Sequence, residues 1–201
     1  MRPFLIAVAC AVVLLVSGAP AAIAGGHQPQ TDPITGMFTF TTVQIKQRTC
    51  VGQDATQLHP YLDITVSQVG TAAGDARISG ELSLTSHILL NTATGLGTSE
   101  GDFVVRDATT GRKKAAGQFH GVIAAVTPAP TFALEGLLTG KVFDEGVGTE
   151  DQVGSGRVVA NLEAFFDAAL NGTGSFGGVG SGLNSAVIES GHCSGPVTRI
   201  P

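Results

Sequence analysis

The sequence predicts an all-β protein, a single antiparallel β-barrel of about eight strands, with a β-sandwich as the alternative. Apolar and polar residues alternate with a period of two over most of the chain, as they do in strands with one buried face. Turn sequences rich in Gly, Asn, Asp and Thr separate these runs. The 28 glycines include several on inward-facing positions, where they relieve crowding in coiled strands. Closure would also remove exposed sheet edges, which favours the barrel.

The N-terminus predicts a cleaved signal helix that precedes the domain. Arg2 gives a positive start, and residues 4–16 form an apolar run that is too short to span a membrane. Ala22 and Ala24 then occupy the −3 and −1 positions of a cleavage site. The sequence therefore divides into a signal peptide (1–24), a flexible leader (25–35) and the barrel domain (36–201), in a secreted or periplasmic protein. An uncleaved membrane helix is the alternative.

The alternation places the strands along the domain. Turns are predicted at 70–74, 91–97 and 107–111, where Gly, Asn and Asp gather. The segment 158–170 also fits an amphipathic helix, but no capping residue immediately precedes it, and we predict a strand. We expect strands near residues 36–50, 60–70, 75–91, 100–107, 114–126, 132–143, 156–168, 173–180 and 184–190.

The charge balance argues against two classes of partner. The chain has 11 basic and 16 acidic residues and a formal net charge of −5. This disfavours binding to a nucleic acid or to an anionic membrane surface, and no membrane insertion of the mature chain is expected. The one basic cluster, Arg112 to Lys114, lies next to a predicted turn and is interpreted as a solvated loop.

Two cysteines remain after cleavage, because Cys10 lies in the signal peptide. An exported chain with an even pair predicts a disulfide between Cys50 and Cys193. Closing a loop of about 140 residues would stabilise the fold by up to roughly 5 kcal/mol in the chain-entropy description. The alternative is two free thiols.

The candidate polar residues form no recognisable catalytic or metal motif. His87 and His120 share the polar face of their strands and would lie close together if those strands are neighbours, and Glu81 and Glu135 would make a possible acid pair. A solvated outer face explains all four more simply. Ser86 lies on an apolar face, either as a group in the lumen or bonded to a backbone carbonyl. We assign no catalytic residue, metal ligand or cofactor.

One part of the chain resembles a known family. The runs GELSLTSHILLNTATGLGTSEGDFVVRD and AAGQFHGVI resemble the hairpins of dirigent proteins and allene oxide cyclases. Gly95, Gly97 and Gly101 match their glycine-rich GxGxxxG stretch. The resemblance implies an eight-stranded barrel whose apolar cavity steers a reactive hydrocarbon intermediate, and it carries over no catalytic residue.

Three functions follow from these observations. The first is an exported non-catalytic barrel that binds a small apolar ligand in its lumen. The second is a dirigent-like or cyclase-like enzyme, and the third is a structural or adhesive envelope protein. An apolar cavity without a buried titratable residue would favour the first, a polar group in an apolar lumen the second, and a filled lumen the third. The oligomeric state does not follow from the sequence.

Overall fold

The computed structural model describes residues 34–53, 58–126, 131–143, 156–177 and 198–200. The chain divides into two compact units, Met1–Gln30 and Thr31–Pro201, and all described residues belong to the second. The predicted signal peptide, most of the predicted leader and the strand predicted at 184–190 lie outside the described residues.

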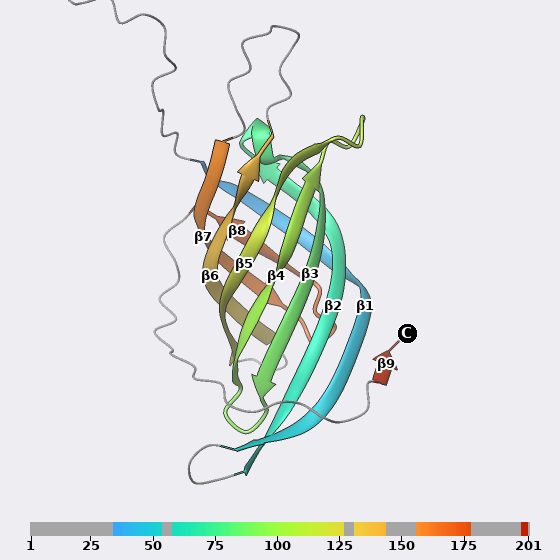
Figure 1. Cartoon of the computed structure of the whole chain (residues 1–201), viewed down its shortest axis with the longest axis vertical. Helices are drawn as coiled ribbons and strands as arrows, with labels where there is room; N and C mark the ends of the chain where they lie inside the picture. The colour runs from blue at the N-terminus through green and yellow to red at the C-terminus, as the bar shows by residue number, and fades with distance from the viewer. Residues whose placement is uncertain (1–33, 54–57, 127–130, 144–155, 178–197, 201) are drawn as a thin grey trace, which may run out of the picture. The chain divides into compact units, whose positions relative to one another are not determined.

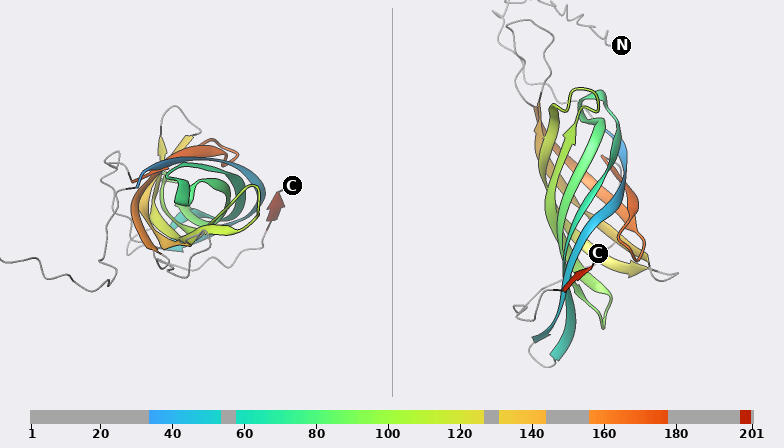
Figure 2. Two further views of the ribbon diagram at one scale, coloured as in Figure 1. Left: turned by 90° about the horizontal axis from the view of Figure 1, so that it is seen from above. Right: turned by 90° about the vertical axis from the view of Figure 1, so that its right-hand side faces the viewer.

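Eight antiparallel strands form one sheet that closes into a ring (Figures 1 and 2). Each strand pairs with the next along the chain, and β1 pairs with both β2 and β8. This confirms the predicted all-β, antiparallel class. A short ninth strand adds to the edge of β1. The strands are β1 (Gly36–Gln53), β2 (Leu58–Gly74), β3 (Gly80–Asn91), β4 (Leu96–Arg106), β5 (Lys113–Val126), β6 (Thr131–Val142), β7 (Gly156–Phe166), β8 (Gly172–Phe176) and β9 (Thr198–Ile200).

The period-two alternation places the core inside the ring. Strand β7 shows it most clearly, because Val158, Leu162 and Phe166 are buried whereas Val159 and Phe165 are exposed. The segment that also fitted a helix is therefore a strand up to Phe166. Burying a large apolar side chain stabilises the fold by roughly 1.5–3 kcal/mol, so the alternation determines which face of each strand turns inward.

The connection between β2 and β3 differs from the sequence prediction. Residues 70–74 do not form a turn but continue β2, where Gly70 pairs with both Phe40 and Leu82. A Cβ at Gly70 would collide with the carbonyl oxygen of Thr39, so the glycine is needed for strand packing. The chain reverses at Asp75 and at η1 (Ala76–Ile78), a 3₁₀ helix.

Paired glycines let β5 and β6 approach closely on the inner side. Gly117 pairs with Gly140, and Gly121 pairs with Gly136. A Cβ at Gly117 would meet the Thr139 carbonyl oxygen and would lie 2.8 Å from the Phe103 ring. The inward glycines predicted from the sequence thus make room for backbone and for the aromatic core.

Side chains close the core at both ends. The short helix η1 lies at one end of the ring (Figure 2). Its Ile78 is 6 % exposed and belongs to the core. Leu170, in the turn between β7 and β8, is also 6 % exposed and closes the other end. Beyond Leu170, the β1–β2 hairpin projects past the ring (Figure 1). Within the described residues, no helix has the length and apolar character needed to cross a membrane.

Candidate functional site

The middle of the ring is filled by apolar side chains. The rings of Phe40 and Phe166 lie 5.6 Å apart between centroids, and those of Phe38 and Phe40 lie 5.8 Å apart. The enclosed cavity among the core side chains measures only about 60 Å³. Small-molecule pockets usually measure about 300–1,000 Å³, so this cavity does not hold such a ligand without repacking of the core.

Three polar side chains face this enclosed cavity. Gln68, Ser86 and Ser99 are all buried and line it. Ser86 thus lies on the inner face of β3, at the position where the sequence left open a lumen group or a bond to a backbone carbonyl. Among the residues that line the enclosed cavity, none carries an ionisable side chain.

The turn between β7 and β8 folds into the ring. It lies between the core and the end of the ring where β1 and β2 project. Gln68 Nε2 donates a hydrogen bond to the Leu170 carbonyl oxygen at 2.6 Å, and Thr42 Oγ1 donates to the same oxygen at 2.9 Å. Asn171 Oδ1 accepts a hydrogen bond from the backbone N–H of Thr42 at 2.8 Å. These bonds join residues more than a hundred positions apart and hold the turn inside.

Asp167 organises the same turn from within. Its Oδ1 accepts hydrogen bonds from the backbone N–H groups of Ala169 and Asn171, each at 2.9 Å. Backbone donation from Asn171 is the main cause that lowers the pKa of Asp167 below its ordinary value. Leu170 takes φ = 60°, a left-handed conformation that is unfavourable for a side chain with a Cβ. The Leu170 side chain is nevertheless buried in this conformation.

A second pocket lies on the other side of Leu170, at the end of the ring where β1 and β2 project. Its volume is about 470 Å³. We call it the end pocket. Apolar side chains from β1, β2, β3, β5, β6 and the turn make up most of its wall: Val43, Ile45, Leu62, Ile64, Ile88, Leu90, Ile123, Phe132, Ala168, Ala169 and Leu170.

Four polar residues also line the end pocket, and none is ionisable. Thr42 and Asn171 are already bonded to each other and to the turn. Gln44 is exposed and pairs with Ser67. Gln47 is half-buried and pairs with the buried Ile64, on the inner face of β1. Among the residues whose side chains the structure describes, none is a hydrogen-bond partner of the Gln47 side-chain amide.

The outer face carries a separate polar cluster around Asp63 of β2. Arg48 Nε donates to Asp63 Oδ2 at 2.6 Å, and His87 Nε2 lies 2.9 Å from Asp63 Oδ1. The Asp63 side chain is 9 % exposed, against 34 % for Arg48 and 46 % for His87. Arg48 and His87 cover the carboxylate while their own side chains stay in contact with water.

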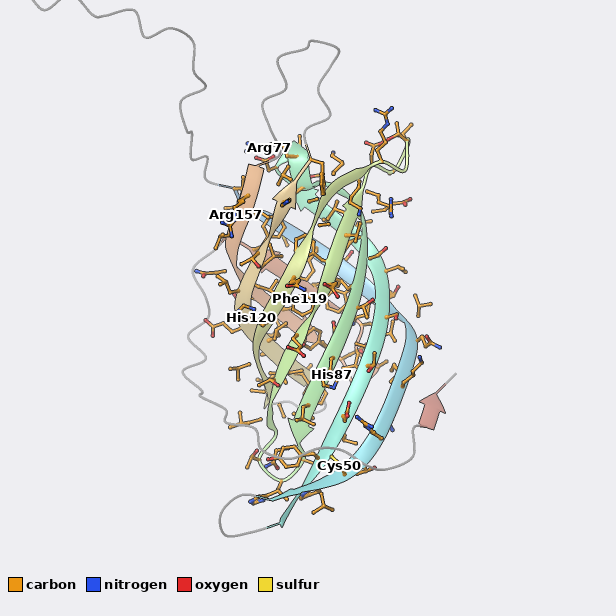
Figure 3. All side chains as sticks on the ribbon, viewed as in Figure 1. Cys50, Arg77, His87, Phe119, His120 and Arg157 are labelled. Carbon is orange, nitrogen blue, oxygen red and sulfur yellow. The ribbon has the colours of Figure 1, made fainter. Side chains whose placement is uncertain are left out.

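The predicted histidines lie near each other on this outer face, separated by one strand. His87 pairs in register with Glu100, and Glu100 pairs with His120. Figure 3 labels the two histidines, which lie on β3 and β5. His87 Nδ1 lies 3.8 Å from Glu100 Oε1. A shallow groove of about 420 Å³ follows these residues, and His120 is exposed. Within the described part of the chain, no three His, Cys, Asp or Glu side chains are arranged to hold a metal ion.

The remaining predicted candidates do not join either pocket. Glu81 is exposed and pairs in register with Arg106. Glu135 is half-buried and pairs with Glu163 and Val122. Glu81 and Glu135 lie on β3 and β6, which are not adjacent in the sheet. The structure therefore does not bring them together through strand pairing.

Sequence reasoning missed the end pocket and its two most informative residues. Leu170 was expected within a strand or helix, and Gln47 carried no pattern that set it apart from other polar strand residues. Asn171 and Gly172 were a usable signal, since an Asn-Gly pair marks a chain reversal. A search of protein-family models, curated proteins and solved structures found no match to this chain.

Proposed function

We propose that this protein is an exported, non-catalytic binding protein that holds a small, largely apolar molecule in the end pocket. The observation that carries the proposal is the chemistry of that pocket, which has a volume of about 470 Å³ and a mainly apolar wall, with no ionisable side chain among the described residues that line it. Ligand pockets of this kind are mainly apolar with a few polar groups that set orientation. The enclosed cavity is too small for the same task.

The pocket volume limits the ligand. At about 30 Å³ per water-sized group, the pocket accepts on the order of fifteen to twenty non-hydrogen atoms. Removing such a molecule from water is favourable by about 25 cal/mol per Å² of apolar surface. Part of this gain is offset by lost ligand freedom, so we expect micromolar rather than nanomolar affinity.

The two alternative functions receive less support. The buried polar residues Gln68, Ser86 and Ser99 meet the criterion set for an enzyme of the dirigent or cyclase kind. The cavity that they line measures only about 60 Å³, however, and no described residue that lines either pocket is ionisable. The family resemblance stays a prediction. An adhesive role would need a contiguous apolar patch on the outer face. The filled middle of the ring agrees with such a role. The exposed large apolar residues of the described chain are nevertheless spread over β1, β2, β7 and the residue after β6: Met37, Val43, Val51, Val69, Phe143, Val159 and Phe165.

The architecture supports a closed β-barrel whose outer face is in contact with water. We infer that the closed sheet works as a β-barrel rather than a sandwich, because every strand from β1 to β8 pairs on both sides. Its outer face carries charged residues such as Glu100 and Asp102, both exposed, and its inner face is apolar. A lipid-facing barrel has the opposite arrangement.

Export and the disulfide belong to the same proposal. Cys193 lies outside the described residues, and Cys50 is on β1. Strand β9 begins five residues after Cys193 and pairs Thr198 with Gln47, which is three residues from Cys50. This antiparallel register supports a bridge between the two cysteines. Intact mass spectrometry of the exported protein should find it beginning near Gly25 and two hydrogen atoms lighter than the reduced chain.

Binding is tested with the fluorescent apolar probe N-phenyl-1-naphthylamine and a variant that fills the end pocket. Ala169 is exposed in the turn and lines the pocket, so Ala169→Trp should occupy the space without disturbing the core. We expect probe affinity to fall at least tenfold. The control is Val159→Trp, on the outer face of β7. Equal probe binding by both variants, or no binding by the unchanged protein, would reject the proposal.

A further inference from the structure

We infer that Gln47 recognises the head group of the ligand, and that this head group is uncharged and able to form hydrogen bonds. The inference rests on the proposed function and adds the chemical class of the ligand. A suitable molecule has an apolar body of about ten carbons and a terminal hydroxyl or carbonyl.

The position of Gln47 is the first argument. It occupies the inner face of β1, in register with Ile64, and shares the pocket wall with Ile45 and Leu62. Its amide offers two N–H donors and one carbonyl acceptor. None of the residues whose side chains are described bonds this amide. A ligand that fills the pocket therefore covers the amide and must supply the partner that water would otherwise provide.

The second argument is that the other polar residues of the pocket are already bonded or face outward. Thr42 and Asn171 already form hydrogen bonds to each other and to residues of the 167–171 turn. Gln44 is exposed, and its register partner Ser67 belongs to the outer face. Gln47 is therefore the polar side chain of this pocket that is both turned inward and available.

The absence of charge in the lining is the third argument. No Lys, Arg or His is among the described residues that line the end pocket. The nearby cation Arg48 is held on the outer face by Asp63. A carboxylate entering the pocket would lose water without gaining a cation, which is costly. Burying an alcohol or a ketone costs far less free energy, because a hydrogen bond to Gln47 replaces one hydrogen bond to water.

The test compares decan-1-ol with decanoate as competitors of N-phenyl-1-naphthylamine, at about pH 8 where the carboxylate is ionised. We expect the unchanged protein to bind decan-1-ol at least about tenfold more tightly than decanoate. Gln47→Leu should weaken decan-1-ol about two- to tenfold, the effect of one lost hydrogen bond, and leave probe affinity unchanged. Gln118→Leu, on the outer face of β5, is the matched control.

A second variant tests recognition by a gain of binding. Gln47→Lys places a cation at the same position and should reverse the preference in favour of decanoate. The inference is overturned if the unchanged protein binds the two competitors equally, or if neither Gln47 variant changes the preference between them. In both cases, binding of the probe by the unchanged protein would still support the proposed function. Loss of probe binding by the unchanged protein would instead remove the proposed function, and this inference with it.

Discussion

Gln68 and Leu170 are 102 residues apart in the chain, yet Gln68 Nε2 donates a hydrogen bond of 2.6 Å to the Leu170 carbonyl oxygen inside the ring. Gln68 is 5 % exposed and Leu170 is 6 % exposed. The bond satisfies a buried amide with a backbone group that a turn would otherwise leave unpaired. It also fixes the boundary between the filled core and the end pocket, since Leu170 lines both.

Removing the Gln68 donor should loosen this boundary. Gln68→Leu keeps the side-chain volume but deletes the bond to Leu170, leaving Thr42 as the remaining donor to that carbonyl. We expect a loss of about 1–2 kcal/mol in the free energy of unfolding, measured by urea titration. Gln118→Leu, whose side chain makes one long contact of 3.4 Å to Asp102 on the surface, should change stability by less than about 0.5 kcal/mol. Equal losses would contradict the role of Gln68.

At Leu170, the glycine variant should be more stable than the alanine variant, which reverses the usual order. Both substitutions lose the buried side chain, at a cost of about 2–5 kcal/mol. Because φ at Leu170 is 60°, alanine retains the left-handed strain whereas glycine removes it, a difference of about 1–2 kcal/mol. Leu170→Gly should therefore unfold at a higher urea concentration than Leu170→Ala. At Leu162, buried in the middle of β7, the order should be the ordinary one, with glycine the less stable variant.

The paired glycines of β5 and β6 should not tolerate a methyl group. A Cβ at Gly117 meets the Thr139 carbonyl oxygen and the Phe103 ring, so Gly117→Ala should cost about 3 kcal/mol or more. Gly156, at the start of β7, has no atom within 4 Å of a built Cβ, and Gly156→Ala should stay within about 0.5 kcal/mol of the unchanged protein. Thermal unfolding followed by circular dichroism measures both. A stable Gly117→Ala protein would show that β5 and β6 are farther apart than described.

The turn before β3 should contribute a small acid-sensitive stabilisation. Side-chain hydrogen bonds from Arg77 are the main cause that lowers the pKa of Asp75 from 3.8 to about 2. A carboxylate with a lowered pKa stabilises the fold above its unfolded pKa, and this contribution disappears as the pH falls through the folded value. The pair is on the surface, so Asp75→Asn should cost only about 0.2–1 kcal/mol at about pH 6.

The pH dependence separates this effect from a general loss of structure. The difference between the unchanged protein and Asp75→Asn should shrink between about pH 4 and pH 2, because the unchanged carboxylate becomes protonated in that window. Melting temperatures at about pH 6 and pH 2 measure it, and Asp102→Asn is the surface control. A difference that stays constant with pH would exclude the ion pair as its cause.

The sequence alone determined which side of each strand faces inward. In β7, the alternation of Val158, Leu162 and Phe166 with polar or exposed neighbours follows from the two-residue period of an extended backbone, which is a local property. The same reasoning located the histidines on one polar face and the glycines on the inner face of β5. The predicted turn at 70–74 was wrong because Gly70 is required by a neighbouring strand, and neighbours are not visible locally.

Only the tertiary structure decided where the end pocket lies. The end pocket exists because the ring closes between β1 and β8 and because the 167–171 turn folds inward onto Gln68 and Thr42. Those contacts join segments more than a hundred residues apart, and their register depends on the whole sheet rather than on any local pattern. In the sequence, Gln47 is an ordinary polar strand residue. The closed sheet places it on the inner face of β1, in the wall of the end pocket.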